Sequence, residues 1–340
     1  MAAFLITGGA GFIGSHLAER LLELGHRVLI LDDLSTGSIH NIAAFRSHPL
    51  LEFVPESVLA TRTLVEMADA ADVIFHLAAS VGVFNIVHSP VATIENNVAG
   101  TEAVLRAASH KRKKVILAST SEVYGKSKDA PFREDGDLVF GATTKARWSY
   151  AASKVIDEFL ALAYWRERKV PTVIVRLFNT IGPRQTGRYG MVVPRFLCQA
   201  LSGRNLTVYG TGRQSRCFTY VADVVEWLLR LAGTDRAVGE IFNLGNPEEI
   251  TIEQLAQRVI ALTGAQVAID YIPYDEAYAA GFEDMERRVP DISKVTSLTG
   301  YCPRVPLEEA LRLTRDWLVA ERIVEKTADF CYGQRESDAR

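Results

Sequence analysis

The sequence predicts an α/β fold: a doubly wound parallel sheet, followed by a smaller C-terminal lobe. Two observations predict it. Short apolar runs alternate with amphipathic helical patterns through the first half of the chain, and each run is continuously apolar instead of alternating with polar residues. Runs of that kind are typical of parallel strands buried on both faces. Strand–helix alternation then places helices on both sides of the sheet.

The predicted strands of the sheet cover residues 3–7, 27–32, 51–54, 73–77, 114–119 and 171–178. Amphipathic helices are predicted between them at 12–24, 90–109 and 150–168. Connections between parallel strands are expected to be right-handed. The rhythm changes after residue 178, where residues 179–190 are rich in Gly, Pro, Thr and Arg and are predicted to form a loop. A strand is expected next at 206–209, with helices at 191–201, 220–231, 251–262 and 307–320.

Composition excludes several classes of protein. The 340 residues carry 38 Lys and Arg against 41 Asp and Glu, a net charge of −3, which gives no electrostatic case for binding nucleic acid or an anionic membrane. No stretch approaches the roughly 18 apolar residues of a membrane helix, and the apolar start lacks the basic segment of a signal peptide. The four cysteines form no C-x-x-C pair, so no metal site is predicted. We expect a cytoplasmic protein with reduced thiols.

Glycines follow the first predicted strand directly, in the run Gly8-Gly9-Ala10-Gly11-Phe12-Ile13-Gly14. The run fits G-x-G-x-x-G from Gly9 or G-x-x-G-x-x-G from Gly8, and a helix is predicted to begin within it. Such glycines let the backbone approach a pyrophosphate, which then faces the N–H groups of the helix N-terminus. Asp32 ends the second strand, where a carboxylate binds ribose hydroxyls and repels a 2′-phosphate. The pattern therefore predicts a site for NAD in preference to NADP.

A tyrosine and a lysine lie four residues apart in Tyr150-Ala-Ala-Ser-Lys154, at the start of a predicted helix. Residues at that spacing share one helix face, and a nearby cation lowers the pKa of a tyrosine. Tyr150 is therefore predicted to be a general base near neutral pH. The chain holds a second match, Tyr124-Gly-Lys-Ser-Lys128, but it lies in a polar segment interrupted by a glycine.

Polar side chains end the fifth predicted strand in Ser119-Thr-Ser-Glu122. In doubly wound sheets, ligands bind at the carboxyl ends of the strands. The hydroxyl groups there can hold a substrate oxygen beside Tyr150, and Glu122 can act as an acid or a base or orient the substrate. The same residues could also form an ordinary solvated turn.

These motifs together resemble the extended short-chain dehydrogenase/reductase family. The resemblance spans about residues 3–318 and includes His76-Leu-Ala-Ala79, Asn97 and Ser119-Thr-Ser-Glu-Val-Tyr-Gly125. Two further segments, Arg176-Leu-Phe-Asn-Thr-Ile-Gly-Pro-Arg184 and Val208-Tyr-Gly-x-Gly-x-Gln-x-Arg216, are similar to the nucleotide-sugar branch of the family. The resemblance implies a Rossmann domain that holds NAD and a C-terminal lobe that binds a nucleoside diphosphate sugar. Members of this branch oxidise the sugar at C4, and then epimerise, dehydrate or decarboxylate it.

The resemblance also implies how the chain is divided. We expect residues 1–178 to form the NAD-binding domain, joined by about 217–242. Residues 179–216 and 243–330 would form the nucleotide-sugar-binding lobe, with 331–340 as a tail. The cofactor-binding residues implied by the family are Gly8, Gly11, Phe12, Ile13, Gly14, Asp32, Asp33, Leu77, Ala78, Ala79, Asn97, Ser119, Tyr150 and Lys154. A homodimer formed through the helices at 90–109 and 150–168 is implied as well.

The three chemistries differ in a few residues. An epimerase needs no extra carboxylate, and its family members usually carry a small residue in place of Glu122. A 4,6-dehydratase usually has an Asp–Glu pair where this chain has Ser121 and Glu122. A decarboxylase needs cationic recognition of the C6 carboxylate and a proton donor for C5.

Three segments resemble the UDP-glucuronate decarboxylases: Thr120-Ser-Glu122, Lys145-Ala-Arg-Trp-Ser-Tyr150 and Gly281-Phe-Glu-Asp-Met-Glu-Arg-Arg288-Val-Pro290. The resemblance makes Thr120, Glu122, Tyr150, Lys154 and Arg288 the candidate catalytic residues. The candidate substrate-binding residues are Val81, Thr120, Ser121, Arg147, Asn179, Arg184, Val193, Arg216 and Phe282. The first hypothesis is therefore an NAD-dependent UDP-glucuronate decarboxylase that acts through a 4-keto intermediate.

Other functions stay open at this point. Residues 179–187 also occur in relatives known as epimerases, so a UDP-sugar 4-epimerase acting on UDP-glucose or UDP-glucuronate is the second hypothesis, followed by a 4,6-dehydratase. An NAD-binding sensor without chemistry is a third class, against which Tyr150, Lys154, Thr120 and Glu122 argue. The chain also departs from the family: Glu56-Ser57 replaces a Gly-Asp pair that holds adenine, and Phe282 replaces an aromatic residue with a hydroxyl group.

Overall fold

Seven parallel strands form the central sheet, in the order β10-β6-β5-β4-β1-β2-β3. The computed structural model describes residues 1–82, 89–188, 190–277 and 283–323. The strands of this sheet are β1 (Ala3–Thr7), β2 (Arg27–Leu31), β3 (Leu51–Val54), β4 (Val73–His76), β5 (Lys114–Thr120), β6 (Thr172–Leu177) and β10 (Ile241–Leu244). Each predicted strand of the first half is present, with ends that move by at most one residue. The predicted doubly wound α/β fold is confirmed.

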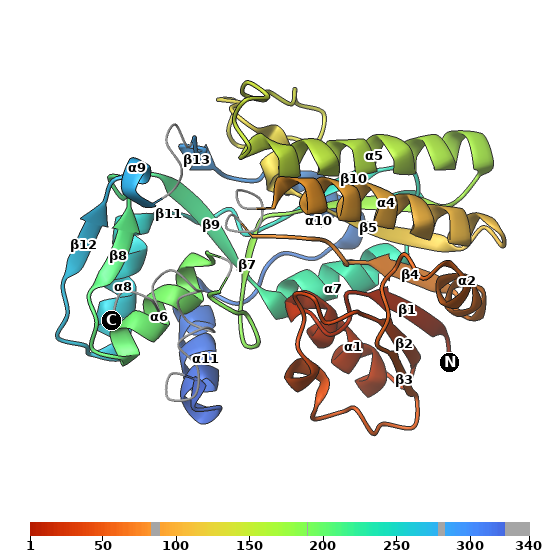
Figure 1. The fold of residues 1–340 in the computed structure, drawn as a ribbon, viewed down its shortest axis with the longest axis horizontal. Coiled ribbons are helices and arrows are strands. Elements are labelled where there is room, and N and C mark those ends of the chain that lie inside the picture. The colour runs from red at the N-terminus through yellow and green to blue at the C-terminus, as the bar shows by residue number, and fades with distance from the viewer. Residues whose placement is uncertain (83–88, 189, 278–282, 324–340) are drawn as a thin grey trace.

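Helices cover both faces of this sheet (Figure 1). They are α1 (Phe12–Glu23), α2 (Thr61–Ala70), α4 (Pro90–Ser109), α5 (Trp148–Arg168) and α7 (Val221–Ala232). One apolar core joins α1 and α7 to the sheet through residues such as Leu17 and Trp227. A second core joins α2, α4 and α5 to the opposite face through residues such as Leu64 and Ala161. Both faces are thus buried, as the continuous apolar strands predicted.

A smaller lobe lies beside the large sheet, at the left of Figure 1. One of its sheets contains β7 (Asn179–Ile181), β9 (Ser215–Tyr220), β11 (Glu249–Thr251) and β13 (Arg287–Arg288). The other pairs β8 (Leu206–Tyr209) with β12 (Ile269–Ile272). Around them lie α6 (Val192–Leu201), α8 (Ile252–Thr263), α9 (Tyr274–Ala277) and α11 (Leu307–Ala320), while α10 (Ser293–Thr299) packs near β10. Short 3₁₀ turns are η1 (Ile39–Ile42), η2 (Ser121–Tyr124) and η3 (Asp235–Ala237).

The predicted loop at 179–190 differs from the structure at its start. Residues Asn179–Ile181 form β7, which pairs in parallel with β9. A three-residue strand carries little local signal, because its hydrogen bonds go to a strand nearly forty residues further along the chain. This pairing fixes Asn179 at the junction between the two lobes.

One segment of the small lobe returns to the large one. The N–H of Phe132 donates to the carbonyl of Val289 at 2.8 Å, and the N–H of Asp291 donates to the carbonyl of Phe132 at 2.9 Å. These bonds hold the chain directly after β13 against the segment that follows β5. They bring Arg288 close to Glu122, although 166 residues separate the two in sequence.

The state of the cysteines differs from the prediction at one position. Cys217 and Cys302 are free thiols, whereas Cys198 is disulfide-bonded. The expectation of reduced thiols is therefore wrong for Cys198, since nothing in the spacing of the cysteines indicated a pair. In the described part of the chain, no helix is both long and apolar enough to cross a membrane. The predicted tail at 331–340 lies outside the described residues.

Candidate active site

A cavity of about 1350 Å³ runs from the carboxyl ends of the large sheet into the small lobe. It is lined by 23 of the site residues predicted from the sequence: Gly8, Gly11, Phe12, Ile13, Gly14, Asp32, Asp33, Leu77, Ala78, Ala79, Val81, Ser119, Thr120, Ser121, Glu122, Arg147, Tyr150, Lys154, Asn179, Arg184, Val193, Arg216 and Arg288. Two predicted site residues are not in this lining. Asn97 does not line the cavity, and Phe282 lies outside the described residues. The two lobes therefore converge on one site.

The glycine turn shapes one end of this cavity. Gly8 has a φ of +74°, and a Cβ atom there would lie 2.7 Å from the backbone nitrogen of Ala78. A Cβ atom at Gly14 would lie 2.2 Å from the carbonyl oxygen of Gly8. Side chains at these positions would therefore break the turn that closes β1 onto α1. No side chain caps the start of α1 at Gly11, so its first N–H groups can bind an anion.

Asp32 lies at the end of β2, beside this turn. Its carboxylate accepts the N–H of Ala10 at 2.9 Å and the N–H of Leu34 at 2.8 Å. Burial raises the pKa of Asp32, while these two hydrogen bonds lower it. The glycine cradle, the uncapped helix and the oriented carboxylate fit the pyrophosphate and ribose of NAD.

Asn97 has a supporting position on α4 and is buried. Its side-chain oxygen accepts the N–H of Ser80 at 2.8 Å, and its amide donates to the Ser153 hydroxyl at 3.2 Å. It thereby ties the loop after β4 to the helix that carries Tyr150. Its place in the structure is behind the cavity wall.

Tyr150 is buried at the start of α5 and forms a hydrogen bond with the Thr120 hydroxyl at the end of β5. The Thr120 oxygen also accepts the N–H of Glu122 at 3.2 Å, which leaves its own proton free to be donated to Tyr150. This contact favours the phenolate, because a hydrogen bond donated to the charged form stabilises it.

The expected lowering of the Tyr150 pKa by Lys154 is wrong for this structure. Burial raises the pKa of Tyr150, and the Glu122 carboxylate raises it further. Lys154 donates from Nζ to Asp157 Oδ2 at 2.9 Å, and both groups are buried. The four-residue spacing predicts that Tyr150 and Lys154 share a helix face. It does not predict that Asp157 binds the Lys154 ammonium and offsets its charge.

The second Tyr-x-x-x-Lys match has a structural role at its tyrosine. Tyr124 lies in η2, is fully buried, and donates from its hydroxyl to Asn243 Oδ1 at 2.7 Å. Burial raises the pKa of Tyr124 to about 12. Tyr124 therefore supports the junction between η2 and β10 and is not a candidate base.

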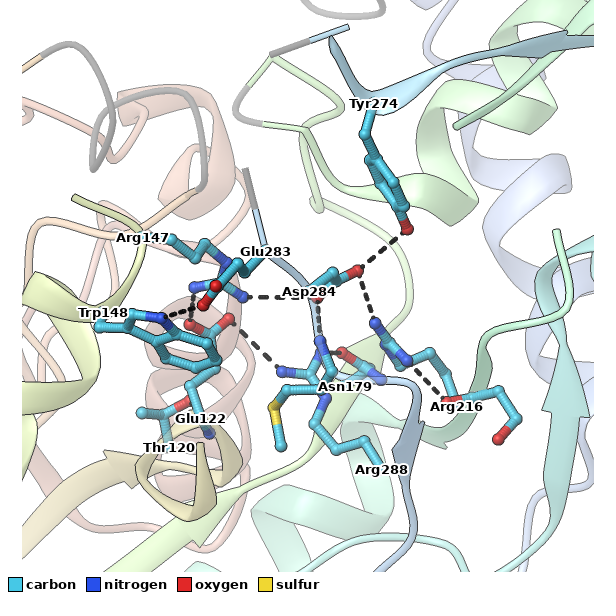
Figure 2. A network of polar contacts seen from close by, with 12 residues as sticks. Thr120, Glu122, Arg147, Trp148, Asn179, Arg216, Tyr274, Glu283, Asp284 and Arg288 are labelled. Carbon is cyan, nitrogen blue, oxygen red and sulfur yellow. Dashed lines mark hydrogen bonds and ion pairs between the residues drawn. The ribbon is translucent and has the colours of Figure 1, made fainter. Parts of the chain in front are cut away.

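Glu122 is held by two arginines from opposite sides of the site (Figure 2). Arg147, directly before α5, donates from Nη1 to Glu122 Oε2. Arg288, on β13, lies with Nη1 3.4 Å from Glu122 Oε1. Burial acts to raise the pKa of Glu122, but the two guanidinium groups prevail and lower it to about 2. Glu122 is therefore ionised at every physiological pH.

Arg288 is a buried cation of this cluster with a lowered pKa. Its Nη2 donates to Asn179 Oδ1 on β7, and its buried Nε has no hydrogen-bond partner among the described residues. Burial lowers the pKa of Arg288 to about 10, assisted by the nearby charge of Arg216. Its guanidinium thus combines a free N–H with a lowered affinity for its proton.

Sequence reasoning missed Asp284, which links two of the predicted arginines. Its Oδ2 lies 2.8 Å from Arg216 Nη2, and its Oδ1 lies 3.9 Å from Arg147 Nη2. Tyr274 also donates to Asp284 Oδ2 at 3.4 Å, and Figure 2 shows Asp284 between the three side chains. Asp284 stands in the quoted Gly281–Arg288 motif, but nothing local to the motif indicates which arginines it meets.

Two predicted residues have partners that define a supporting role. The Ser119 hydroxyl donates to Glu158 Oε1 at 2.5 Å, and Glu158 also receives both Nε and Nη2 of buried Arg176. Arg184 donates from Nη2 to Glu19 on α1 at 2.7 Å. Ser119 and Arg184 line the cavity, while these bonds fix the strand end and the cavity wall.

Acid is expected to destabilise the folded protein through Glu122. Its pKa of about 2 lies below the unfolded value of about 4.3. The stability from this carboxylate is therefore present above pH 4.3 and is lost as the pH falls towards 2. The loss should be on the order of 3 kcal/mol in the free energy of unfolding. Urea unfolding of the native protein and of Glu122→Gln, at pH 7 and pH 3, should show a smaller pH effect in the variant. Equal pH effects would contradict the ionised state.

Comparison with known proteins agrees with the geometry. Residues 5–314 match the GDP-mannose 4,6 dehydratase family. A UDP-N-acetyl-alpha-D-glucosaminuronate decarboxylase of Bacillus cytotoxicus is 44% identical over 315 residues, 92% of this chain and 96% of that protein. UDP-glucuronic acid decarboxylase 1 of Danio rerio is 37% identical over 319 residues, 93% of this chain and 72% of that protein. A Bacillus cereus UDP-glucuronic acid 4-epimerase, solved with UDP-glucuronic acid and NAD, has a TM-score of 0.84 at 29% identity, and the match covers 94% of this chain and 99% of that one.

The fold and the site define an enzyme that acts on nucleotide sugars. The chain belongs to the GDP-mannose 4,6-dehydratase-like family of extended short-chain dehydrogenases/reductases.

Proposed function

We propose that this protein is an NAD-dependent UDP-glucuronate decarboxylase. The observation that carries the proposal is the arginine cluster beside Tyr150. Arg147, Arg216 and Arg288 face the two carboxylates of Glu122 and Asp284. Three positive charges against two negative ones leave one positive charge, which is complementary to the single carboxylate of a hexuronate. A neutral hexose would leave that charge buried without a counter-ion, which is unfavourable.

The first step is oxidation at C4 of the sugar. The Tyr150 phenolate takes the proton of the C4 hydroxyl and becomes a phenol, and the hydrogen bond from Thr120 stabilises the phenolate before the transfer. The glycine turn, Asp32 and Lys154 would hold NAD, which when bound would supply a reversible hydride acceptor for C4.

The second step is loss of CO₂. The 4-keto group is β to the carboxylate, so the C5–C6 bond can break with its electron pair moving into an enolate at O4. Arg288 and Arg147 neutralise charge at this point, and Glu122 keeps both guanidinium groups in place. C5 then takes up a proton. Glu122 is ionised, so we assign the donation of this proton to Arg288 or to a water molecule that it binds.

A related substrate is the main competing candidate. The relative that is 44% identical is named as a decarboxylase of the 2-acetamido sugar UDP-N-acetylglucosaminuronate, whereas relatives at 36–38% identity are named for UDP-glucuronate. A 4-epimerase is the second candidate, favoured by the similarity to the Bacillus cereus epimerase structure. The Glu122–Arg147–Arg288 cluster supports decarboxylation, since epimerisation needs no second step on the carboxylate.

A substrate panel tests the proposed function. Purified protein with NAD is incubated with UDP-glucuronate, UDP-N-acetylglucosaminuronate and UDP-glucose, each labelled with ¹³C at C6, and labelled CO₂ is measured by mass spectrometry. We expect CO₂ from UDP-glucuronate. Release only from the acetamido substrate would move the assignment to that sugar. Conversion of any of the three without CO₂ would replace the decarboxylase by an epimerase or a dehydratase.

We further propose a homodimer that forms through α4 and α5. These two helices pack side by side, and they expose Val91, Ile94, Ile156 and Phe159 at 66%, 40%, 49% and 70%. Exposed apolar groups on adjoining helices are typical of an interface, and a second copy would present the same surface.

Phe159→Asp is expected to convert the dimer to a monomer, because a charge at the centre of an apolar interface stays desolvated there. Light scattering coupled to size-exclusion chromatography measures the mass. Val319→Asp replaces another exposed apolar side chain, on α11, and should leave the mass unchanged. A native monomer, or a dimeric Phe159→Asp, would rule out this interface.

A further inference from the structure

Asp157 is a buried acid that the proposed chemistry does not use. It lies on α5, one helical turn after Lys154, and its side chain is fully buried. Its Oδ2 accepts Lys154 Nζ at 2.9 Å, and a hydrogen bond with the Thr101 side chain on α4 also favours its charged form. Aspartate is a poor residue for the interior of a helix. A buried ion pair of this kind is often no more stable than an apolar pair, so stability alone does not account for Asp157.

The surroundings couple this carboxylate electrostatically to Tyr150, although Asp157 is not among the residues that line the cavity. The titratable side chains coupled to the Lys154–Asp157 pair are Tyr150 and Glu158 on α5 and His76 on β4, while Glu122 on η2 and Arg147 directly before α5 act on Tyr150. Asp157 acts on Tyr150 electrostatically and raises its pKa, as Glu122 does. His76 is neutral, since burial and the Lys154 charge lower its pKa to about 3. Asp157 is therefore the acid that directly contacts the lysine.

We propose that Asp157 is a positioning residue for the Tyr150–Lys154 pair: its carboxylate holds the Lys154 ammonium in one orientation and offsets its charge beside the Tyr150 hydroxyl. The inference rests on the proposed function for the role of Tyr150 as the base. With the lysine charge offset, Tyr150 stays a phenol until a further positive charge arrives. The oxidised nicotinamide ring of NAD carries such a charge, and it must lie beside Tyr150 because the O4 proton and the C4 hydride leave neighbouring atoms. Asp157 would thus favour oxidised over reduced cofactor.

Two measurements test this role in Asp157→Asn. The first is binding of NAD and of NADH by calorimetry, which needs no sugar. Loss of the negative charge that offsets the Lys154 ammonium should weaken binding of the positively charged NAD about tenfold relative to NADH binding. The second is the pH dependence of nicotinamide reduction at 340 nm in a single turnover with UDP-glucuronate. Its rising limb should move about one pH unit lower, because the ammonium is no longer offset.

The controls separate this role from a structural one. Asp157→Glu keeps the charge and should restore both the native NAD/NADH affinity ratio and the native pH limb. Glu167→Gln removes an exposed carboxylate from the same helix and should change neither. Asp157→Ser is a smaller neutral variant that can still accept a hydrogen bond from Lys154, and it is used if Asp157→Asn does not fold.

Equal weakening of NAD and NADH binding, with an unchanged pH limb, would overturn the proposal and leave Asp157 as a structural residue. The binding ratio is independent of the sugar chemistry. A protein that reduces NAD without releasing CO₂ would therefore refute the decarboxylase assignment and leave the Asp157 result intact.

Discussion

Tyr150→Phe is expected to lower kcat for UDP-glucuronate by about a thousandfold, within the range measured for loss of a general base. The substitution removes only the hydroxyl that bonds to Thr120, and the ring keeps its packing at the start of α5. Without a base, the C4 hydroxyl cannot lose its proton as C4 is oxidised. Nicotinamide reduction at 340 nm and CO₂ release should therefore fall together, while the affinity for NAD changes little.

Tyr164→Phe provides the matched control. Tyr164 lies on the same helix, is buried, and is not among the residues that line the cavity; its hydroxyl accepts Arg168 Nη1 at 3.3 Å. Loss of this hydroxyl should leave kcat within about twofold, because the substitution keeps the buried ring and removes one hydrogen bond outside the site. A Tyr150→Phe variant with more than a tenth of the native rate would show that another group is the base.

Arg288→Gln is expected to uncouple the two steps. Oxidation at C4 should persist, because Tyr150 and Thr120 are untouched. CO₂ release should fall by about 10² to 10³, the usual cost of removing one preorganised electrostatic group. Arg288 is buried and faces Glu122 and Asn179, so the variant also leaves Glu122 with one cation in place of two. The expected signature is reduced nicotinamide that accumulates in the first turnover while CO₂ appears slowly.

Arg287→Gln is the control for this variant. Arg287 is the neighbouring residue on β13, but it points outward and pairs with Glu249 on the small-lobe surface. An exposed pair of this kind contributes at most about 1 kcal/mol to stability, and activity should be unchanged. If Arg288→Gln slowed C4 oxidation and CO₂ release equally, the arginine would serve substrate binding and not the second step.

The parts of the site that the sequence could predict are those built from near neighbours. The strand–glycine–helix turn at Gly8 to Gly14 and the Tyr150–Lys154 pair each lie within one turn or one helix, so spacing alone defines them. Glu122 and Arg288 were identified by resemblance to a family, one motif at a time. Their contact depends on the register of β13 against β9 and on the bonds between Phe132 and the chain after β13, which no local pattern contains.

The predictions that failed also depended on contacts between residues far apart in the sequence. Lys154 was expected to lower the pKa of Tyr150, but burial raises it and Asp157 binds the ammonium. Desolvation depends on everything packed around α5, and it cannot be deduced from a spacing of four residues. Asp284 was missed because its partners, Arg147 and Arg216, come from the two different lobes.

The most direct test of the decarboxylase assignment is a proton NMR time course in D₂O, with purified protein, NAD and UDP-glucuronate. In D₂O the group that protonates C5 carries deuterium in place of its exchangeable proton, so each turnover places one deuterium on C5. We expect the signal of the glucuronate H5 to disappear and that of a UDP-pentose to grow, with one deuterium at C5 and the C4 proton retained. Formation of UDP-galacturonate with an intact C6 carboxylate would contradict the decarboxylase assignment and make the arginine cluster a binding site for an epimerase substrate.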